Sequence, residues 1–358
     1  TKEQNMAIQG YSTAVSRNLI RAAQGMLEHA QPITVLGDFG TQREMPQNST
    51  DTLVFRRTLP FGANTAGTTI EGTSRYSGTP VIDSASFALA EGVTPNANTI
   101  SFQDITVQLQ QYGVLFKFSS KTESLYEDDI PGEMVKLTGE VMAEVMEKIR
   151  YGTLRSATTV IYGNGSSRAA VNTVLTLNAL RKAARTLESN RARRVTSRLA
   201  PGVNFGTRAV QPSYIVFTHT DGEADARNLP LFTRVEDYGS FKPVHDREYG
   251  ACEQFRFVSS PLFNPFLAAG SATLNGCLSV GGSNVDVYPV IVIGEDAWGQ
   301  VALKGMNGMK PIVLKASQTN HANPLGQFGY VGASTWFACV RLNDAWMAKI
   351  EVGVSALV

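Results

Sequence analysis

Few residues of this sequence combine the types and the spacing that catalysis or metal binding requires. The four histidines are widely separated, so none forms a paired metal-ligand motif or a Cys–His pair. Cys252, Cys277 and Cys339 are equally scattered, which favours reduced, buried thiols over a disulfide framework. The sequence therefore predicts no metal site, no cofactor and no catalytic centre, and indicates that the chain is not an enzyme.

Two further segments match ligand-binding motifs only in part. The stretch Gly163–Ser167 lacks the Gly-Lys-Ser/Thr ending of a phosphate-binding loop, so a plain turn is the simpler interpretation. Asp221, Glu223 and Asp225 alternate along the chain but miss the pattern of a calcium-binding loop. A helix that starts there would favour such acidic side chains.

The composition limits the class of protein. The 358 residues are enough for two domains of ordinary size, and 43% of them are hydrophobic. The net charge of +1 gives no sign of a surface that is basic or acidic as a whole. The N-terminus has no apolar signal core, and no run approaches the ~18 apolar residues of a membrane span. We therefore expect folding in a cytoplasm and no membrane partner.

The elements around these residues indicate a protein that contacts its neighbours. Leu53–Leu59 and Ile105–Leu109 have the patterns of two extended strands, and more than half of residues 60–99 between them are Gly, Ser, Thr, Asn or Pro. Loops longer than ~15 residues are uncommon in compact domains and usually serve binding. A projecting hairpin of this kind is of little use to a monomeric enzyme, so the sequence favours an assembly subunit.

Helical periodicity recurs in three places. Residues 11–30 have the spacing of an amphipathic helix, although an isolated helix of this length needs a surface to dock on. Asp128, Asp129 and Pro131 are start signals for a second helix over 131–155, which would be about 37 Å long at ~1.5 Å per residue. A third helix is predicted from Leu177 to about Arg191.

Strand patterns dominate the C-terminal half. Tyr214–Phe217 and Val290–Ile293 are continuous apolar runs, as in strands that are buried on both faces. Residues 346–354 alternate between apolar and polar positions, and a turn at Asn343-Asp344 precedes them. We therefore predict that residues 336–340 form the strand that pairs with 346–354.

Two segments carry charge of one sign. Seven basic residues between 181 and 198 oppose one glutamate, and eight acidic residues between 123 and 147 oppose one lysine. Two solvated helix faces would explain both segments, because exposed ion pairs contribute little. Alternatively, the unlike segments meet between subunits, or the basic segment faces DNA and neutralises its phosphates.

Several motifs resemble those of a family of tailed-phage major capsid proteins, named after the short-tailed coliphage N-four. The resemblance includes Glu91–Pro95, Gln111–Gly113, Tyr288–Gly294, Asn323–Gly329 and the final Leu342–Glu351. These matches are scattered over residues 51–358, and their order is similar to that of the family. The family fold is the α+β, Hong Kong 97-like capsid fold.

The resemblance implies a division of the chain into parts. Residues 1–50 would be an N-terminal arm, and 51–112 an extended hairpin called the E-loop. Residues 113–175 and 300–358 would form a peripheral domain whose spine helix spans 131–155, and 176–299 would form an axial domain. The stretch from Ala63 to Ser86 is longer than the usual tip of the E-loop.

The same resemblance implies a function and partners. Copies of the chain would form hexamers and pentamers of an icosahedral head that encloses double-stranded DNA, bound without sequence preference. Portal, scaffolding and decoration proteins would be further partners, and the virion would assemble in the bacterial cytoplasm. Two alternatives are a nanocompartment shell of the same fold, which would enclose an enzyme, and a soluble α/β enzyme with a pocket in 213–299.

Contacts between subunits can be assigned as candidates. Some relatives of the fold join their subunits by an isopeptide bond from an E-loop lysine, but no lysine lies between Lys2 and Lys117 here, so we predict no such bond. Arginine makes forked bonds to carboxylates, and the acidic helix of a neighbour is a suitable target. The candidate contact residues are Arg56, Arg57, Val81, Ile82, Phe87, Glu140, Glu144, Arg193 and Arg194.

Overall fold

The computed structural model describes most of the chain outside the N-terminus and the hairpin tip. The described residues are 25–26, 34–48, 50–58, 88–89, 91–92, 94, 100, 102–125, 127, 129–195, 212–238, 243–305, 310–319 and 323–357. The helix predicted over 11–30 falls almost wholly outside them, as do three of the candidate contacts, Val81, Ile82 and Phe87.

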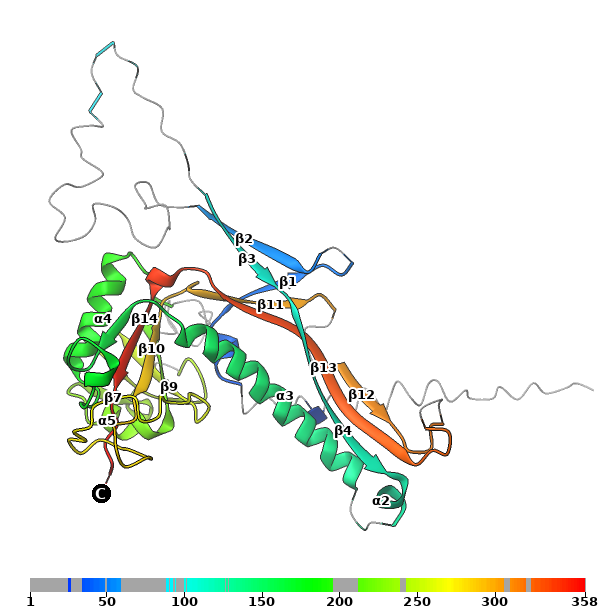
Figure 1. Ribbon diagram of the computed structural model, residues 1–358. Coiled ribbons are helices and arrows are strands. Elements are labelled where there is room, and N and C mark those ends of the chain that lie inside the picture. Colours follow the sequence, from blue (N-terminus) through cyan, green and yellow to red (C-terminus); the bar gives the residue numbers. More distant parts are fainter. Residues whose placement is uncertain are drawn as a thin grey trace, which may run out of the picture.

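Two sheets, a hairpin and one long helix form the framework (Figure 1). The five-stranded sheet contains β1 (Thr41–Met45), β4 (Gln110–Ser119), β11 (Trp298–Leu303), β12 (Lys310–Leu314) and β13 (Phe328–Arg341). The seven-stranded sheet has the order β5-β14-β10-β6-β9-β8-β7. Its strands are β5 (Val160–Tyr162), β6 (Tyr214–Thr218), β7 (Phe232–Arg234), β8 (Glu248–Cys252), β9 (Phe255–Ser259), β10 (Tyr288–Ile293) and β14 (Met347–Val352). The hairpin pairs β2 (Thr52–Thr58) with β3 (Phe102–Gln108).

Short helices connect or cover these strands. In the described part of the chain, the shorter α-helices include α2 (Ser120–Leu125), α4 (Leu177–Ser189) and α5 (Glu223–Arg227). Single 3₁₀ turns are η1 (Leu36–Asp38), η3 (Arg168–Ala170), η4 (Thr220–Gly222), η5 (Val235–Asp237) and η6 (Asp344–Trp346).

The long helix α3 (Ile130–Arg155) begins one residue before the predicted 131–155. The side chain of Asp129 accepts a hydrogen bond from the backbone N–H of Gly132 at 3.2 Å, and a proline occupies the first turn. The first half of α3 packs on the five-stranded sheet through Met142 and its neighbours. The second half packs on the seven-stranded sheet through Tyr151 and Leu154. One helix therefore belongs to two hydrophobic cores.

The two faces of the seven-stranded sheet are covered by different elements. Along β10, Val290 and Val292 face the core that contains α4, whereas Ile291 and Ile293 face the core that contains the end of α3. The apolar runs predicted as strands buried on both faces are β6 and β10, and all of their residues are buried. The side chains on both faces of these strands are apolar because neither face of the sheet is in contact with solvent here.

The predicted pairing of residues 336–340 with 346–354 is wrong. β13, which contains 336–340, pairs with β4, β11 and β12 in the five-stranded sheet. β14 instead pairs with β10 and β5 in the seven-stranded sheet. An alternating pattern is typical of a strand with one solvent-exposed face, but Lys349 and Glu351 of β14 are buried and pair with each other at 3.1 Å. Buried ion partners take the place of solvent on this face.

The sheets also cross the boundaries that were predicted for the domains. Residues 41–45 of the predicted N-terminal arm form β1, which pairs in parallel with β11 of the five-stranded sheet. β5 and β14 lie in the two segments assigned to the peripheral domain, yet they pair in the seven-stranded sheet with strands of the predicted axial domain. By their sheet, β5 and β14 group with the strands of the predicted axial domain, whereas the predicted domain boundaries place them in the peripheral domain.

Candidate assembly surfaces

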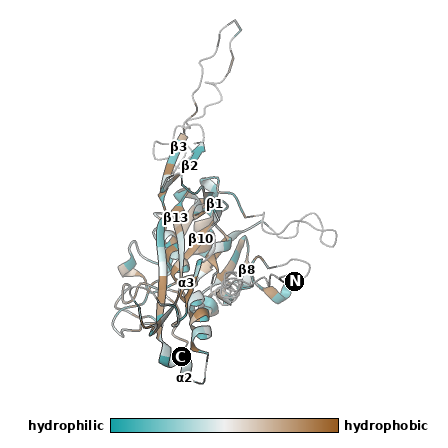
Figure 2. Ribbon diagram, turned by 90° about the vertical axis from the view of Figure 1, so that its right-hand side faces the viewer, coloured by the Kyte–Doolittle hydropathy of each residue, from teal (hydrophilic) through white to brown (hydrophobic). Residues whose placement is uncertain are grey.

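The hairpin β2–β3 is anchored at its root and exposed beyond it. The side chains of Phe55 and Val107 are buried in a cluster with residues of β1, β11 and β13. The N–H of Leu109 also donates to the carbonyl oxygen of Asp51 at 3.0 Å, which closes the root. Beyond the root the two strands lie at one extremity of the described fold (Figure 2). On the outward face Val54 is 46% exposed and Phe102 is 58% exposed.

The candidate contacts Arg56 and Arg57 point to opposite sides of this hairpin. Arg56 makes a forked bond to Asp104 on β3, at 2.8 and 2.9 Å. This hydrogen bond raises the pKa of Arg56 and lowers the pKa of the Asp104 carboxyl. Arg57 donates to the side-chain oxygen of Gln103 at 2.9 Å, and burial lowers its pKa. The forked bond that we predicted for a neighbour's carboxylate is thus made inside the chain, and a contact of either arginine with another subunit stays a prediction.

The acidic stretch of α3 divides into an outer part and a buried part. Glu144 pairs with Lys148 at 2.5 Å, and Glu133 pairs with Lys136 at 2.7 Å, all with partly exposed side chains. Glu140 is half-buried. Lysines of the same helix therefore neutralise two carboxylates of the predicted acidic segment, whereas Glu123 and Glu127, before the helix, are exposed.

Glu147 belongs to the buried part and organises the segment before β1. Its carboxylate is fully buried and accepts the backbone N–H of Val35 at 3.1 Å and of Leu36 at 2.7 Å. Arg150, one turn later, donates to it at 3.2 Å and to the Gln300 side chain at 3.0 Å. Burial raises the pKa of Glu147, although these hydrogen bonds oppose the shift. The carboxylate therefore connects the start of η1 to helix α3 by two hydrogen bonds.

Sequence reasoning placed Glu147 on a charged helix face and missed this role. The spacing of Glu147 from apolar residues of the helix could have indicated that it is buried. Glu147 follows the buried Ala143 by four residues and precedes the buried Tyr151 by four, so it lies on the same face of the helix as both. A charged residue in the apolar stripe of a helix predicts a buried partner, although the identity of that partner is not readable from spacing.

The basic stretch at α4 contains both paired and unpaired side chains. Arg194 donates to Glu188 at 2.8 Å and to the side chain of Gln254, and its guanidinium lies over the ring of Tyr214. Arg181 makes an ion pair with Glu253. Arg193 is exposed, and its carbonyl oxygen accepts the N–H of Glu295 at 2.9 Å. Of the two candidate contacts here, Arg194 is bound within the chain, whereas the side chain of Arg193 is available.

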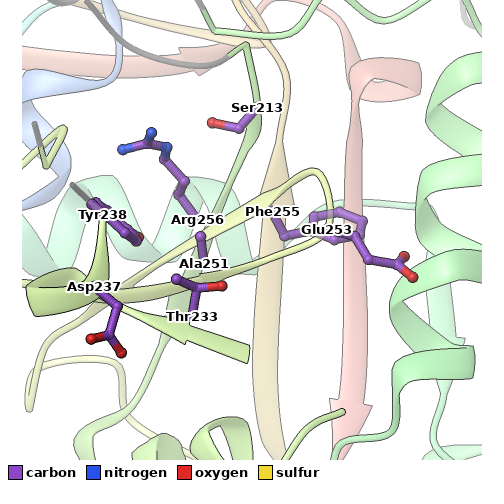
Figure 3. Close-up of a pocket in the computed structure, with 8 residues that line it drawn as sticks. All are labelled: Ser213, Thr233, Asp237, Tyr238, Ala251, Glu253, Phe255 and Arg256. Atoms are coloured by element: carbon purple, nitrogen blue, oxygen red, sulfur yellow. The ribbon is translucent and has the colours of Figure 1, made fainter. Parts of the chain in front are cut away.

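A pocket lies in the region where the alternative of a soluble enzyme placed one (Figure 3). Its volume is about 250 Å³, and it is lined by Ser213, Thr233, Asp237, Tyr238, Ala251, Glu253, Phe255 and Arg256. The buried hydroxyl of Ser213 has no hydrogen-bond partner, and Tyr238 and Arg256 both donate to Glu248, at 2.7 and 3.2 Å. The lining contains no histidine or cysteine. Since the hydroxyl of Ser213 has no hydrogen-bond partner, neither lining carboxylate, Asp237 or Glu253, is placed as its base, and the pocket does not have the geometry of nucleophilic catalysis.

Two of the histidines and two of the acidic residues singled out in the sequence have structural roles. The Nδ1 atoms of His219 and His245 accept backbone N–H groups two residues later, at 3.1 and 3.0 Å. Asp221 accepts the hydroxyl of Tyr288 at 2.8 Å, and Asp225 accepts the N–H of Ser355 at 2.8 Å. In the described part of the chain, no group of three or more His, Cys, Asp or Glu side chains could hold a metal ion. Over the same residues, no helix has the length and apolar character to cross a membrane.

Solved capsid structures share this architecture. The capsid of Ralstonia phage GP4 superposes with a TM-score of 0.63 at 11% identity, over 91% of this chain and 92% of that chain. The acidic stable capsid of Helicobacter pylori bacteriophage KHP30 has a TM-score of 0.54 at 11% identity, over 99% of both chains. The capsid of cyanophage P-SCSP1u has a TM-score of 0.54 at 13% identity, over 90% of this chain and 89% of that chain. The fold is therefore the Hong Kong 97-like fold of phage capsid proteins, as predicted.

The sequence itself gives the family. The family model described as phage capsid protein matches residues 103–312, which is more than half of the chain. The chain therefore belongs to the phage capsid protein family. No curated protein sequence matches it significantly. It is a major capsid protein of the virion's head shell, and a structural protein rather than an enzyme.

Proposed function

We propose that copies of this chain assemble into hexamers and pentamers of an icosahedral head that encloses double-stranded DNA. Assembly in the bacterial cytoplasm, with portal, scaffolding and decoration proteins as partners, belongs to the same proposal. The hairpin β2–β3 acts as the E-loop, and α3 acts as the spine helix. The five-stranded sheet represents the peripheral domain and the seven-stranded sheet the axial domain.

The observation that carries this proposal is the hairpin. Its root is packed, yet its outward face presents Val54 and Phe102 to solvent at the extremity of the fold. Apolar side chains on an exposed ribbon gain free energy only when another surface covers them, at about 25 cal/mol per Å². In a closed shell each subunit meets several neighbours, so many modest contacts of this kind add up through multivalency.

Removal of the apolar side chains of the hairpin tests the proposal. In the full-length chain, Val54→Ser combined with Phe102→Ser should abolish or strongly reduce shells seen by electron microscopy. The matched control is Val280→Ser, because Val280 is 73% exposed but lies far from the hairpin in the sequence. Circular dichroism should show that all variants are folded. Wild-type shell yield from the hairpin variant would contradict the proposed role of β2–β3.

The nature of the enclosed cargo requires a separate measurement. Particles purified from infected cells should protect double-stranded DNA from nuclease, whereas a nanocompartment would hold a protein cargo. The family match favours the phage head over the nanocompartment. Nuclease-treated particles that contain an enzyme and no DNA would contradict the proposal of a DNA-filled head.

A further inference from the structure

Four exposed cations lie on α4 and on the turn that follows it. They are Lys182, Arg185, Arg191 and Arg193, and we refer to them as the α4 basic surface. No described carboxylate pairs with any of the four. The acidic side chains of this region, Glu188 and Glu253, already pair with arginines outside this set. The α4 basic surface is therefore not neutralised within the described part of the chain.

The elements beneath this surface hold it in place. The opposite side of α4 is buried against the seven-stranded sheet through Leu180, Ala183 and Leu187. At the end of the helix the N–H of Arg191 donates to the carbonyl oxygen of Glu188 at 3.0 Å. The backbone of Arg193 is fixed by its hydrogen bond from Glu295. The four side chains thus project from a backbone that is already ordered.

Repulsion between like charges lowers the stability of α4. Lys182 and Arg185 are three residues apart, so these two like charges are neighbours on the helix surface. Pairs of like charge at this spacing destabilise a helix. A surface that keeps them gains stability when an anionic partner covers it.

The acidic side chains of α3 in a neighbouring copy are a poor candidate for that partner. On α3, Glu133 and Glu144 are engaged by Lys136 and Lys148 of the same helix. A contact between α3 and α4 of two copies would have to displace those lysines. An extended polyanion needs no such exchange, because its phosphates are neutralised only by mobile counterions.

We propose that the α4 basic surface contacts the phosphate backbone of the packaged double-stranded DNA. This inference rests on the proposed function and names the part of the subunit that faces the genome. Helix α4, which carries Lys182 and Arg185, lies on the side of the seven-stranded sheet away from α3 (Figure 1). The proposal therefore requires this side of the sheet to face the interior of the shell. Recognition involves charge alone and is independent of base sequence.

Salt dependence of DNA binding tests the proposal. Purified full-length chain is titrated into two fluorescent duplexes of unrelated sequence, and binding is measured by anisotropy at several salt concentrations. The wild type should bind both duplexes equally, with an affinity that falls as salt rises. Each phosphate that a cation neutralises adds about 0.9 to the slope of log affinity against log salt. The variant Lys182→Gln with Arg185→Gln should therefore reduce that slope by roughly 2.

The matched control removes two cations elsewhere. Lys310 and Lys315 are exposed on or beside β12 of the other sheet, and Lys310→Gln with Lys315→Gln changes the net charge by the same amount. This control should keep the wild-type slope. Equal slopes for the α4 variant and the wild type, or no DNA binding by the wild type at low salt, would overturn the proposal.

Electron microscopy of the same samples separates this inference from the proposed function. Normal shells with a reduced salt slope support the DNA contact. An α4 variant that binds DNA like the wild type but fails to form shells would show a contact between copies and overturn the inference. Absence of shells from the wild type would count against the proposed function, whatever the DNA slopes show.

Discussion

Replacement of Glu147 should reveal how strongly the segment before β1 is fastened to α3. In Glu147→Ala, the buried N–H groups of Val35 and Leu36 lose their acceptor, and the buried guanidinium of Arg150 loses its carboxylate. Hydrogen bonds to a charged group contribute about 1.5–3 kcal/mol each but are not additive. Breaking a buried ion pair from one side costs about 3–5 kcal/mol, and we expect a loss in this range.

Two further variants define the size of the effect. Glu147→Gln keeps an oxygen that accepts from Val35 and Leu36 but loses the charge opposite Arg150, so about 1–3 kcal/mol should be lost. Glu144→Ala, one turn earlier, removes a partly exposed ion pair and should cost about 0.5 kcal/mol or less.

Urea unfolding of the unassembled chain, followed by tryptophan fluorescence, gives these free energies. Trp298 is fully buried in the cluster that contains Val35 and Leu36, so it reports on this region. Hydrogen exchange at Val35 and Leu36 should accelerate in Glu147→Ala more than in Glu144→Ala. If the two alanine variants lost equal stability, or if Glu147→Ala lost less than about 1 kcal/mol, the reasoning from burial and hydrogen bonding would be refuted.

Three further predictions follow from other parts of the chain. Burial opposes ionisation of Glu351, but hydrogen bonds from Arg168 and Lys349 outweigh it and hold its pKa below the ordinary 4.5. The ionised carboxylate therefore stabilises the fold above pH 4.5, and this stabilisation is lost as the pH falls. In Glu351→Gln, the free energy of unfolding from urea titrations should fall less steeply at acidic pH than in the wild type. An unchanged pH dependence would contradict this. In α3, Gly152→Ala meets open space and should stabilise the chain by about 0.5–1 kcal/mol, whereas the Cβ of Gly139→Ala would lie 2.3 Å from the carbonyl oxygen of Met26 and should destabilise it in thermal unfolding. Assembled particles boiled in detergent should release only monomer, because no lysine lies between positions 2 and 117; a ladder of covalent multimers on a gel would disprove this.

Features coded by neighbouring residues were predictable from the sequence. The start signals and the apolar stripe of α3 gave its limits to within one residue at the N-terminal end. The apolar runs of β6 and β10 indicated strands with two covered faces, and both lie inside the seven-stranded sheet. The motifs scattered over residues 51–358 indicated a phage capsid protein, and the match of the family model over residues 103–312 gave the same family.

Features that depend on distant partners were not predictable. Glu351 is buried because Arg168, 183 residues away in the sequence, meets it with two hydrogen bonds of 2.8 Å. The sequence shows only that Glu351 alternates with Ile350 and Val352, and not that its face is buried. The turn at Asn343-Asp344 indicated the wrong neighbour for β14, because the strand that pairs with it, β10, is distant in the sequence. For the same reason the partner of Arg56 was sought in another subunit, although Asp104 lies directly opposite it in the register of the hairpin.

The double membership of α3 limits how the subunit can adapt to different positions in a closed shell. A change in the angle between the two sheets would bend a continuous helix of 26 residues and disturb two cores at once. Copies at sites of different local curvature should therefore keep this central part as one rigid strut. The variation that curvature demands should then be concentrated beyond the packed root of β2–β3, on the part of the ribbon where Val54 and Phe102 are exposed.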